Sequence, residues 1–316
     1  MVIEPTVLIV GAGASKDYGY PTALELRDTI LAGLVTNHRL FNMLRDLGHE
    51  REEVERFRNA FRDSSRPSID AFLEWRDEFN SIGKHSIAAA LIPLEDPGKL
   101  PRRVPDRWYD YLWDVLEEGD AEFIENRLTV ITFNYDRSFE HYFASALRET
   151  FNADPSVMAL LVKTLNVIHV HGDLGGLPYV DPKARPYLPQ FSAERVKEAA
   201  ERIKIADRWD DGTAPDADFA RAQEALRNAT RVCFLGFGYN EHNLRRLRFE
   251  GNAKDVLSNR SVFGSVFGLT SEETHAAERR LSPSRHEMIL PLLGSYPITT
   301  YDCLQYLRRA PVFVPR

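Results

Sequence analysis

The sequence predicts an α/β protein with a Rossmann-like parallel sheet and helices on both faces of that sheet. Three observations support this class. Short apolar, β-branched runs recur far apart along the 316 residues, amphipathic helical patterns lie between them, and glycine-rich turns follow two of the runs. The runs are continuously apolar and do not alternate, which is typical of parallel strands covered on both faces.

The apolar runs mark the strands of the predicted sheet. The first run leads directly into a glycine-rich turn, and the second comes only after a long helix-rich segment. The later runs follow at shorter intervals, and strands that alternate with helices are typical of a doubly wound fold. The predicted strands are residues 6–10, 128–133, 166–170, 231–235, 261–269 and 297–301.

Helical periodicity fills the segments between these strands. The first gap is far longer than one crossover helix requires, so we expect a single domain over 1–316 with a helical lobe inserted at 23–127. The stretch 175–189 is rich in proline and glycine and is expected to form a loop over the site. The predicted helices are residues 23–34, 50–61, 69–80, 107–118, 136–148, 192–208, 217–228, 272–281 and 302–309.

Composition excludes several classes of protein. A net charge of −7 argues against a nucleic-acid-binding surface spread over the whole chain. The two cysteines, Cys233 and Cys303, cannot form a disulfide framework or a four-cysteine zinc site. Residues 1–30 lack a cleavable leader pattern and no long apolar run occurs, so we expect a cytoplasmic protein without membrane contact.

The first glycine-rich turn, 11–15 (GAGAS), follows the first strand. Small residues there let the backbone approach a phosphate closely, and the free N–H groups near a helix start favour negative charge. The third glycine of a dehydrogenase fingerprint would fall at Lys16, which disfavours an ordinary dehydrogenase. A tight turn without any ligand remains the alternative. The residues expected to contact the ligand are Gly11, Ala12, Gly13, Ala14 and Ser15.

Polar side chains follow the second strand at 132–136 (TFNYD). Ligands of open α/β sheets bind outside the carboxyl ends of the strands. The amide of Asn134 can donate and accept at once, so it can position a ribose hydroxyl or a water molecule. Asp136 has two interpretations, ligand contact or the N-cap of the helix that follows.

The third strand ends in 169–173 (HVHGD), where a two-residue period would place His169 and His171 on one face. A metal site needs further ligands, and the turn 11–15 stands where the first strand would supply them, so no metal is expected. His171 precedes a glycine at the mouth of the sheet, and this position suits a general base.

A second glycine-rich turn ends the fourth strand. Two such turns at the ends of separate strands can hold the two halves of a dinucleotide, although a tight turn without a ligand is again the alternative. No P-loop and no G-x-S-x-G elbow occurs, so nucleoside-triphosphate hydrolysis and acyl-enzyme chemistry lack their parts. The residues expected to contact the dinucleotide are Gly236, Phe237 and Gly238.

Taken in chain order, these motifs resemble the sirtuin family. The turn 11–15, followed by 19–22 (GYPT) and Arg27, resembles the sirtuin cofactor loop. The motif 132–136 resembles the sirtuin T-Q-N-x-D motif, and 171–172 resembles its catalytic His-Gly pair. The fold is therefore expected to be sirtuin-like.

Two departures from the sirtuin pattern indicate which kind of sirtuin-like protein the chain resembles. Protein-deacylating sirtuins carry a four-cysteine zinc module, which this chain cannot build, and Phe133 replaces the glutamine of T-Q-N-x-D. The pattern is more similar to the sirtuin-like NADase domains of bacterial anti-phage systems. That resemblance implies that NAD is a substrate, hydrolysed to nicotinamide and ADP-ribose.

The resemblance also implies roles for individual residues. The turn 11–15 would hold the pyrophosphate, Asn134 would orient the ribose or the attacking water, and His171 would accept a proton. Asp136 would support the site indirectly, while Tyr20, Pro21 and Thr22 would continue the cofactor loop, the first two shaping the nicotinamide end. The alternatives are an NAD-dependent deacylase or ADP-ribosyltransferase, and a non-catalytic sensor of NAD or ADP-ribose.

An unregulated NADase would poison its host, so we expect its activity to be conditional. The motifs use nearly the whole chain and leave little room for a sensing module. Control is therefore expected through a homo-oligomer, or through a separately encoded activator such as an ATPase or a nucleic-acid-guided protein. The helical lobe at 23–127 is the expected contact surface.

Overall fold

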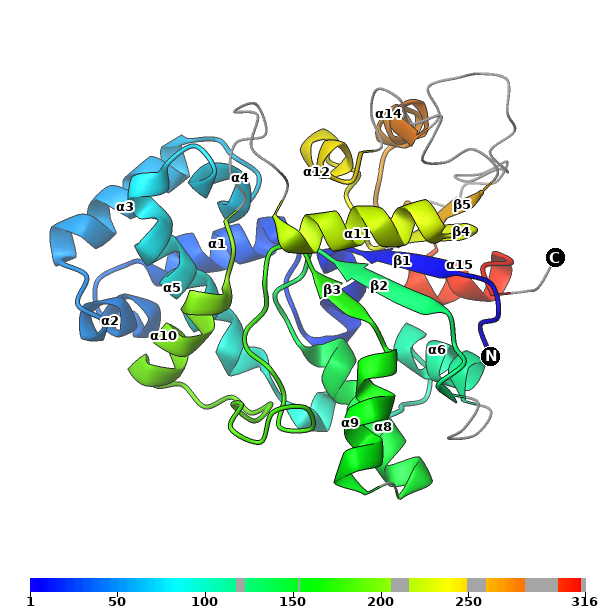
Figure 1. Cartoon of the computed structure of the whole chain (residues 1–316). Coiled ribbons are helices and arrows are strands. Elements are labelled where there is room, and N and C mark those ends of the chain that lie inside the picture. Colours follow the sequence, from blue (N-terminus) through cyan, green and yellow to red (C-terminus); the bar gives the residue numbers. More distant parts are fainter. Residues whose placement is uncertain (118–122, 153, 206–215, 249–259, 282–300, 314–316) are drawn as a thin grey trace.

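The computed structural model describes residues 1–117, 123–152, 154–205, 216–248, 260–281 and 301–313. It confirms the α/β class: a parallel sheet in the order β3-β2-β1-β4-β5 has helices on both faces (Figure 1). The strands are Thr6–Val10 (β1), Leu128–Thr132 (β2), Val167–His169 (β3), Arg231–Leu235 (β4) and Ser261–Gly264 (β5).

Each face of the sheet has its own apolar core, because successive side chains of a strand point to opposite faces. Val7 and Ile9 of β1 pack with α11 (Ala217–Asn228), α12 (Glu241–Arg246) and α14 (Ser271–Leu281). Leu8 and Val10 pack on the other side. The helices of that side are α6 (Trp108–Leu116), α8 (Ser138–Phe151), α9 (Pro155–Thr164) and α15 (Cys303–Arg309).

The remaining helices form a cluster at one end of the sheet, called the helical cluster below (Figure 1). α10 joins this cluster from outside the predicted insertion by packing on α5, whereas α6, inside the insertion, packs on α8 and α15. The cluster therefore follows spatial packing and not the sequence limits 23–127. Its helices are α1 (Ala23–Gly33), α2 (Arg39–Asp46), α3 (Arg51–Asp63), α4 (Ile69–Leu73), α5 (Asn80–Leu91) and α10 (Ala193–Arg202).

Several predicted boundaries were wrong. The helix expected at 69–80 stops at Leu73, and a separate helix, α5, begins at Asn80. α5 was not predicted because it is buried around most of its circumference and lacks an amphipathic stripe. β5 ends at Gly264, short of the predicted 269, and residues 297–300 of the sixth predicted strand lie outside the described residues. Among the helices described, none combines the length and apolarity that crossing a membrane requires.

Candidate functional site

The carboxyl ends of four strands bring the sequence motifs together. In sheet order, the segments that leave β3, β2, β1 and β4 are 170–173, 133–136, 11–15 and 236–238. The strand order reverses between β1 and β4, and open α/β sheets bind their ligands at such a reversal. The motifs therefore gather where the fold favours a ligand site.

Asn134 is buried after β2 and links the turns that follow β1 and β2. Its Nδ2 donates to the carbonyl oxygen of Gly11 at 3.1 Å and to the hydroxyl of Ser15 at 2.9 Å. Its Oδ1 is also buried and has no hydrogen-bond partner among the described residues. Because buried polar atoms nearly always have a partner, this oxygen marks a point where a ligand can donate a hydrogen bond.

Asp136 lies directly before Arg137, the N-cap residue of α8, and bonds the first residue of that helix. Its Oδ1 accepts from the backbone N–H of Ser138 at 3.1 Å and from the hydroxyl of the same residue. Burial raises the pKa of Asp136, although hydrogen bonds from Ser138 and Ser15 act against this rise. The expected N-cap position was thus wrong by one residue, although the Asp136 carboxylate does bond the first turn of α8. The same carboxylate also contacts the Ser15 hydroxyl to which Asn134 donates.

His171 lies among aromatic rings just beyond β3. Its ring centroid is 5.5 Å from that of Phe133 and 5.9 Å from that of Phe219. Burial, followed by the charges of Arg246 and His242, lowers the pKa of His171 to about 3, so its imidazole is neutral near pH 7. The buried Nδ1 has no hydrogen-bond partner within the described ranges. A neutral ring can accept a hydrogen bond or a proton at such an atom.

His169 has different surroundings, and the expectation that it shares a face with His171 was wrong. Its Nε2 lies 2.6 Å from the Glu140 carboxylate on α8, and its Nδ1 lies 2.8 Å from the backbone oxygen of Asn134. Burial is the largest single influence and lowers the pKa of His169. The charge and hydrogen bond of Glu140, together with the Asp173 charge and the Asn134 backbone, outweigh it and raise the pKa to about 9. The strand period fails because β3 ends at His169 and the chain turns there.

The two glycine-rich turns pack directly against each other. The N–H of Gly11 donates to the carbonyl of Leu235 and that of Gly13 to the carbonyl of Gly236, both at 3.0 Å. A Cβ on Gly236 would lie 2.0 Å from the nitrogen of Ala14, and the φ of Gly236 is +55°. The Ala14 N–H donates to the Gly11 carbonyl at 3.0 Å. The close backbone contacts between the two turns require glycine at these positions. The hydrogen bonds also occupy three backbone amides that were expected to face a phosphate.

The rest of the two turns is less constrained. A Cβ on Gly238 would meet no heavy atom within 4 Å. Phe237 is buried, with its ring centroid 5.1 Å from that of Phe133. Ala12 is half-buried at the start of the short helix Ala12–Tyr18. The backbone of Gly238 therefore has open space beside it.

The segment that resembles the rest of the sirtuin cofactor loop has structural contacts throughout. The hydroxyl of Tyr20 lies 2.7 Å from that of Tyr187, and Pro21 is half-buried beside it. The Thr22 hydroxyl accepts from a backbone N–H in the first turn of α1 and so caps this helix. Arg27 donates to backbone carbonyls in the segment 62–66, within the helical cluster and not at the glycine turns.

The segment 175–189 has no helix or strand and is held in place by two buried arginines on one carboxylate. Arg137 donates to the Glu95 oxygens at 3.0 and 2.9 Å, and Arg185 donates to Glu95 at 2.8 Å. Arg137 also donates to the Arg185 carbonyl at 3.0 Å. The loop is thereby fixed to the helical insertion and to the start of α8.

The helical cluster closes over the strand ends through α4 and the residues just after it. The Tyr135 hydroxyl donates to Asp70 on α4, and Glu74 accepts from Arg246 and His242 on α12. We call this set of contacts the closed arrangement. The candidate residues after β2 and β3 are buried within it. A dinucleotide can therefore reach them only when a covering segment moves.

Sequence reasoning did not single out Glu140, Glu74 or Arg246. Glu140 and His169 line, with Asn134 and others, a cavity of about 10 Å³, which is at the lower limit for one water molecule. The position of Glu140 in the first turn after the 132–136 motif was the available signal. In the part of the chain that the structure describes, no three His, Cys, Asp or Glu side chains could hold a metal ion together.

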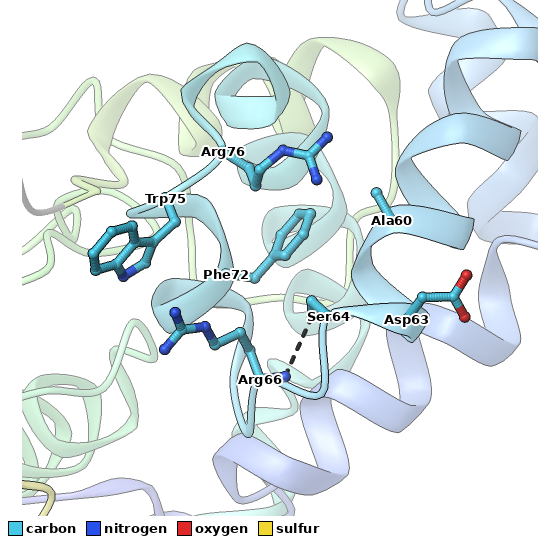
Figure 2. A pocket seen from close by; sticks show the side chains of 7 residues that line it. All are labelled: Ala60, Asp63, Ser64, Arg66, Phe72, Trp75 and Arg76. Carbon is cyan, nitrogen blue, oxygen red and sulfur yellow. Dashed lines mark hydrogen bonds between the residues drawn. The ribbon is translucent and has the colours of Figure 1, made fainter.

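A separate hollow of about 330 Å³ opens on the helical cluster. Figure 2 shows the rings of Phe72 and Trp75 there, with the guanidinium groups of Arg66 and Arg76 beside them. Trp75 is 51% exposed and lies 5.4 Å from the Arg66 guanidinium carbon. The hollow contains none of the predicted site residues, so it is distinct from the strand-end site.

Comparison with known proteins identifies the family. The family model described as SIR2-like domain matches residues 128–289, about half of the chain. The matched segment contains Asn134, His171 and the turn 236–238, but not β1 and its turn. No curated protein matches the chain. The sirtuin resemblance is thus confirmed at the level of the family: the chain belongs to the SIR2-like domain family, whose members bind NAD.

Proposed function

We propose that this protein is an NAD⁺ glycohydrolase that cleaves NAD to nicotinamide and ADP-ribose. The observation that carries the proposal is a pair of buried atoms without a hydrogen-bond partner among the described residues, Asn134 Oδ1 and His171 Nδ1. They follow neighbouring strands in a protein whose family binds NAD. Ribose hydroxyls and water are donors that such acceptors can bind.

Hydrolysis breaks the bond between the nicotinamide nitrogen and ribose C1′ and forms a bond from a water oxygen to the same carbon. Nicotinamide leaves as a neutral molecule and needs no proton. Asn134, held by its Nδ2 contacts, accepts a hydrogen bond from the ribose or the attacking water. His171 accepts the proton that the water or a ribose hydroxyl gives up.

The low pKa of His171 makes it a weak base in the closed arrangement. Arg246 and His242 contribute to that low pKa through their charges. Substrate phosphates near these two residues would offset those charges and raise the pKa of His171. Substrate binding would then strengthen the base that hydrolysis needs.

We also propose that NAD depletion serves a conditional role in anti-phage defence, on the basis of the sequence resemblance. Control would come from a homo-oligomer or from a separately encoded activator, either an ATPase or a nucleic-acid-guided protein. The helical cluster is the proposed contact surface, because it covers the strand ends and also carries the exposed Trp75. A partner that moves this cluster would open the site.

The test is nicotinamide release from NAD by the purified protein and its Asn134→Ala and His171→Ala variants. We expect each variant to lose release by roughly a hundredfold or more while keeping its fold by circular dichroism. His275→Ala, on an exposed position of α14, is the matched control and should keep full release. A fully active His171→Ala protein would exclude the proposed mechanism. NAD binding without release would favour either the sensor or an enzyme that needs its activator, and co-expression with neighbouring genes would separate the two. Release only with an acylated or acceptor protein would favour a deacylase or an ADP-ribosyltransferase.

A further inference from the structure

The contact between Glu74 and α12 joins an arginine and a histidine side chain to one buried carboxylate oxygen. Arg246 Nη2 and His242 Nε2 both approach Glu74 Oε1. The Glu74 side chain is 8% exposed and that of Arg246 is 5% exposed, so this ion pair is largely removed from water. Glu74 comes from the helical cluster and is 172 positions away from Arg246 in the sequence.

This contact adjoins the proposed catalytic histidine. The guanidinium carbon of Arg246 lies 5.7 Å from the centroid of the Phe219 ring, and the same ring is 5.9 Å from that of His171. Arg246 and His242 thus lie at the mouth of the sheet, where the phosphates of a bound dinucleotide would need cationic partners. The backbone amides of Gly11, Gly13 and Ala14 already donate hydrogen bonds within the protein. The glycine turn therefore has fewer free N–H donors for a phosphate than its sequence predicts.

We propose that Arg246 and His242 bind the pyrophosphate of the dinucleotide and that Glu74 occupies their site as an internal anion until the substrate displaces it. This inference rests on the proposed function, since it names the phosphate contacts of the same site. A guanidinium binds carboxylate and phosphate with the same donors, so the two anions compete directly. Each dinucleotide that binds must break the Glu74 contact first.

Displacement of Glu74 also loosens the cover of the site. Asp70 lies one turn before Glu74 and accepts a hydrogen bond from the hydroxyl of Tyr135, a residue of the motif after β2. Asp70 and Glu74 belong to the same short segment, so a displacement of Glu74 also displaces Asp70. NAD can bind only those molecules in which the segment has moved away from the site. The apparent affinity for NAD is therefore the intrinsic affinity multiplied by the fraction of such molecules.

Calorimetric binding of ADP-ribose and of inorganic pyrophosphate to the full chain tests this inference, because neither ligand carries a nicotinamide bond to cleave. We expect Glu74→Gln to tighten both ligands by about tenfold. Glu78→Gln, which removes an exposed carboxylate of the same segment, is the matched control and should change neither affinity. Unchanged or weaker binding by folded Glu74→Gln protein would overturn the inference.

Replacing the Arg246 guanidinium should have the opposite effect on ligand binding. In the Glu74→Gln background, Arg246→Gln should weaken ADP-ribose binding by more than about tenfold relative to Glu74→Gln alone. The double variant leaves no unpaired Glu74 charge, so a loss of fold is not expected. Equal affinity in the two proteins would overturn the assignment of Arg246. Tighter binding by Glu74→Gln without any nicotinamide release would support this inference without supporting the proposed hydrolase.

Discussion

The ion pair between His169 and Glu140 holds a ring against the backbone of Asn134, one of the two proposed catalytic residues. The pKa of His169 is raised to about 9 in the folded protein, above the ordinary value near 6.5. The stabilisation is therefore fully present below about pH 6.5 and is lost as the pH rises through about 9. On linkage grounds the loss is on the order of 3 kcal/mol of unfolding free energy.

Urea denaturation near pH 6 and near pH 9.5 measures this effect. We expect Glu140→Gln to be less stable than the unmodified chain at the lower pH and nearly equal to it at the higher one. Glu149→Gln, an exposed position of the same helix, is the control and should follow the unmodified chain throughout. Parallel pH profiles for Glu140→Gln and the unmodified chain would show that the pair contributes no pH-dependent stability.

At the scale of single elements, the packed glycine turns join the first and fourth strands. Gly236→Ala places a Cβ 2.0 Å from the Ala14 nitrogen at a positive φ, so we expect a loss of more than about 3 kcal/mol or failure to fold. Gly238→Ala meets open space and should stay within about 0.5 kcal/mol of the unmodified chain. Thermal and urea unfolding of the two variants give the comparison. Equal stability of both would contradict the packing argument.

The sequence predicts the sheet well and the helical cluster less well, for physical reasons. Buried parallel strands are continuously apolar, and this pattern can be recognised in the sequence without knowing which segments pack against them. α5 has no such pattern, because neighbouring helices bury most of its surface. The motif after β2 could be predicted to gather with that after β3, since carboxyl ends of parallel strands meet at one edge. The Glu74–Arg246 contact could not, because nothing local in either segment points to the other.

At the scale of the whole molecule, ligand binding should change the protection of a defined region. The site residues are buried under α4 and the residues after it, so a bound dinucleotide must displace this cover. We expect ADP-ribose to increase amide hydrogen exchange over residues 69–76 and to leave β1 and β4 protected. Mass spectrometry of the exchanged peptides reports both regions. Unchanged exchange at 69–76 with saturating ligand would mean that the dinucleotide enters by another route.

The central place of β1 also bears on how the chain folds while it is being synthesised. β1 pairs with β2 on one side and β4 on the other, yet it leaves the ribosome before either partner exists. Helices α1 to α5 of the helical cluster lie between β1 and β2 and can pack on one another during that interval, before α10 is made and packs on α5. The nascent chain therefore carries an apolar, unpaired strand for more than one hundred residues of translation, so β1 is exposed to aggregation until β2 has been made.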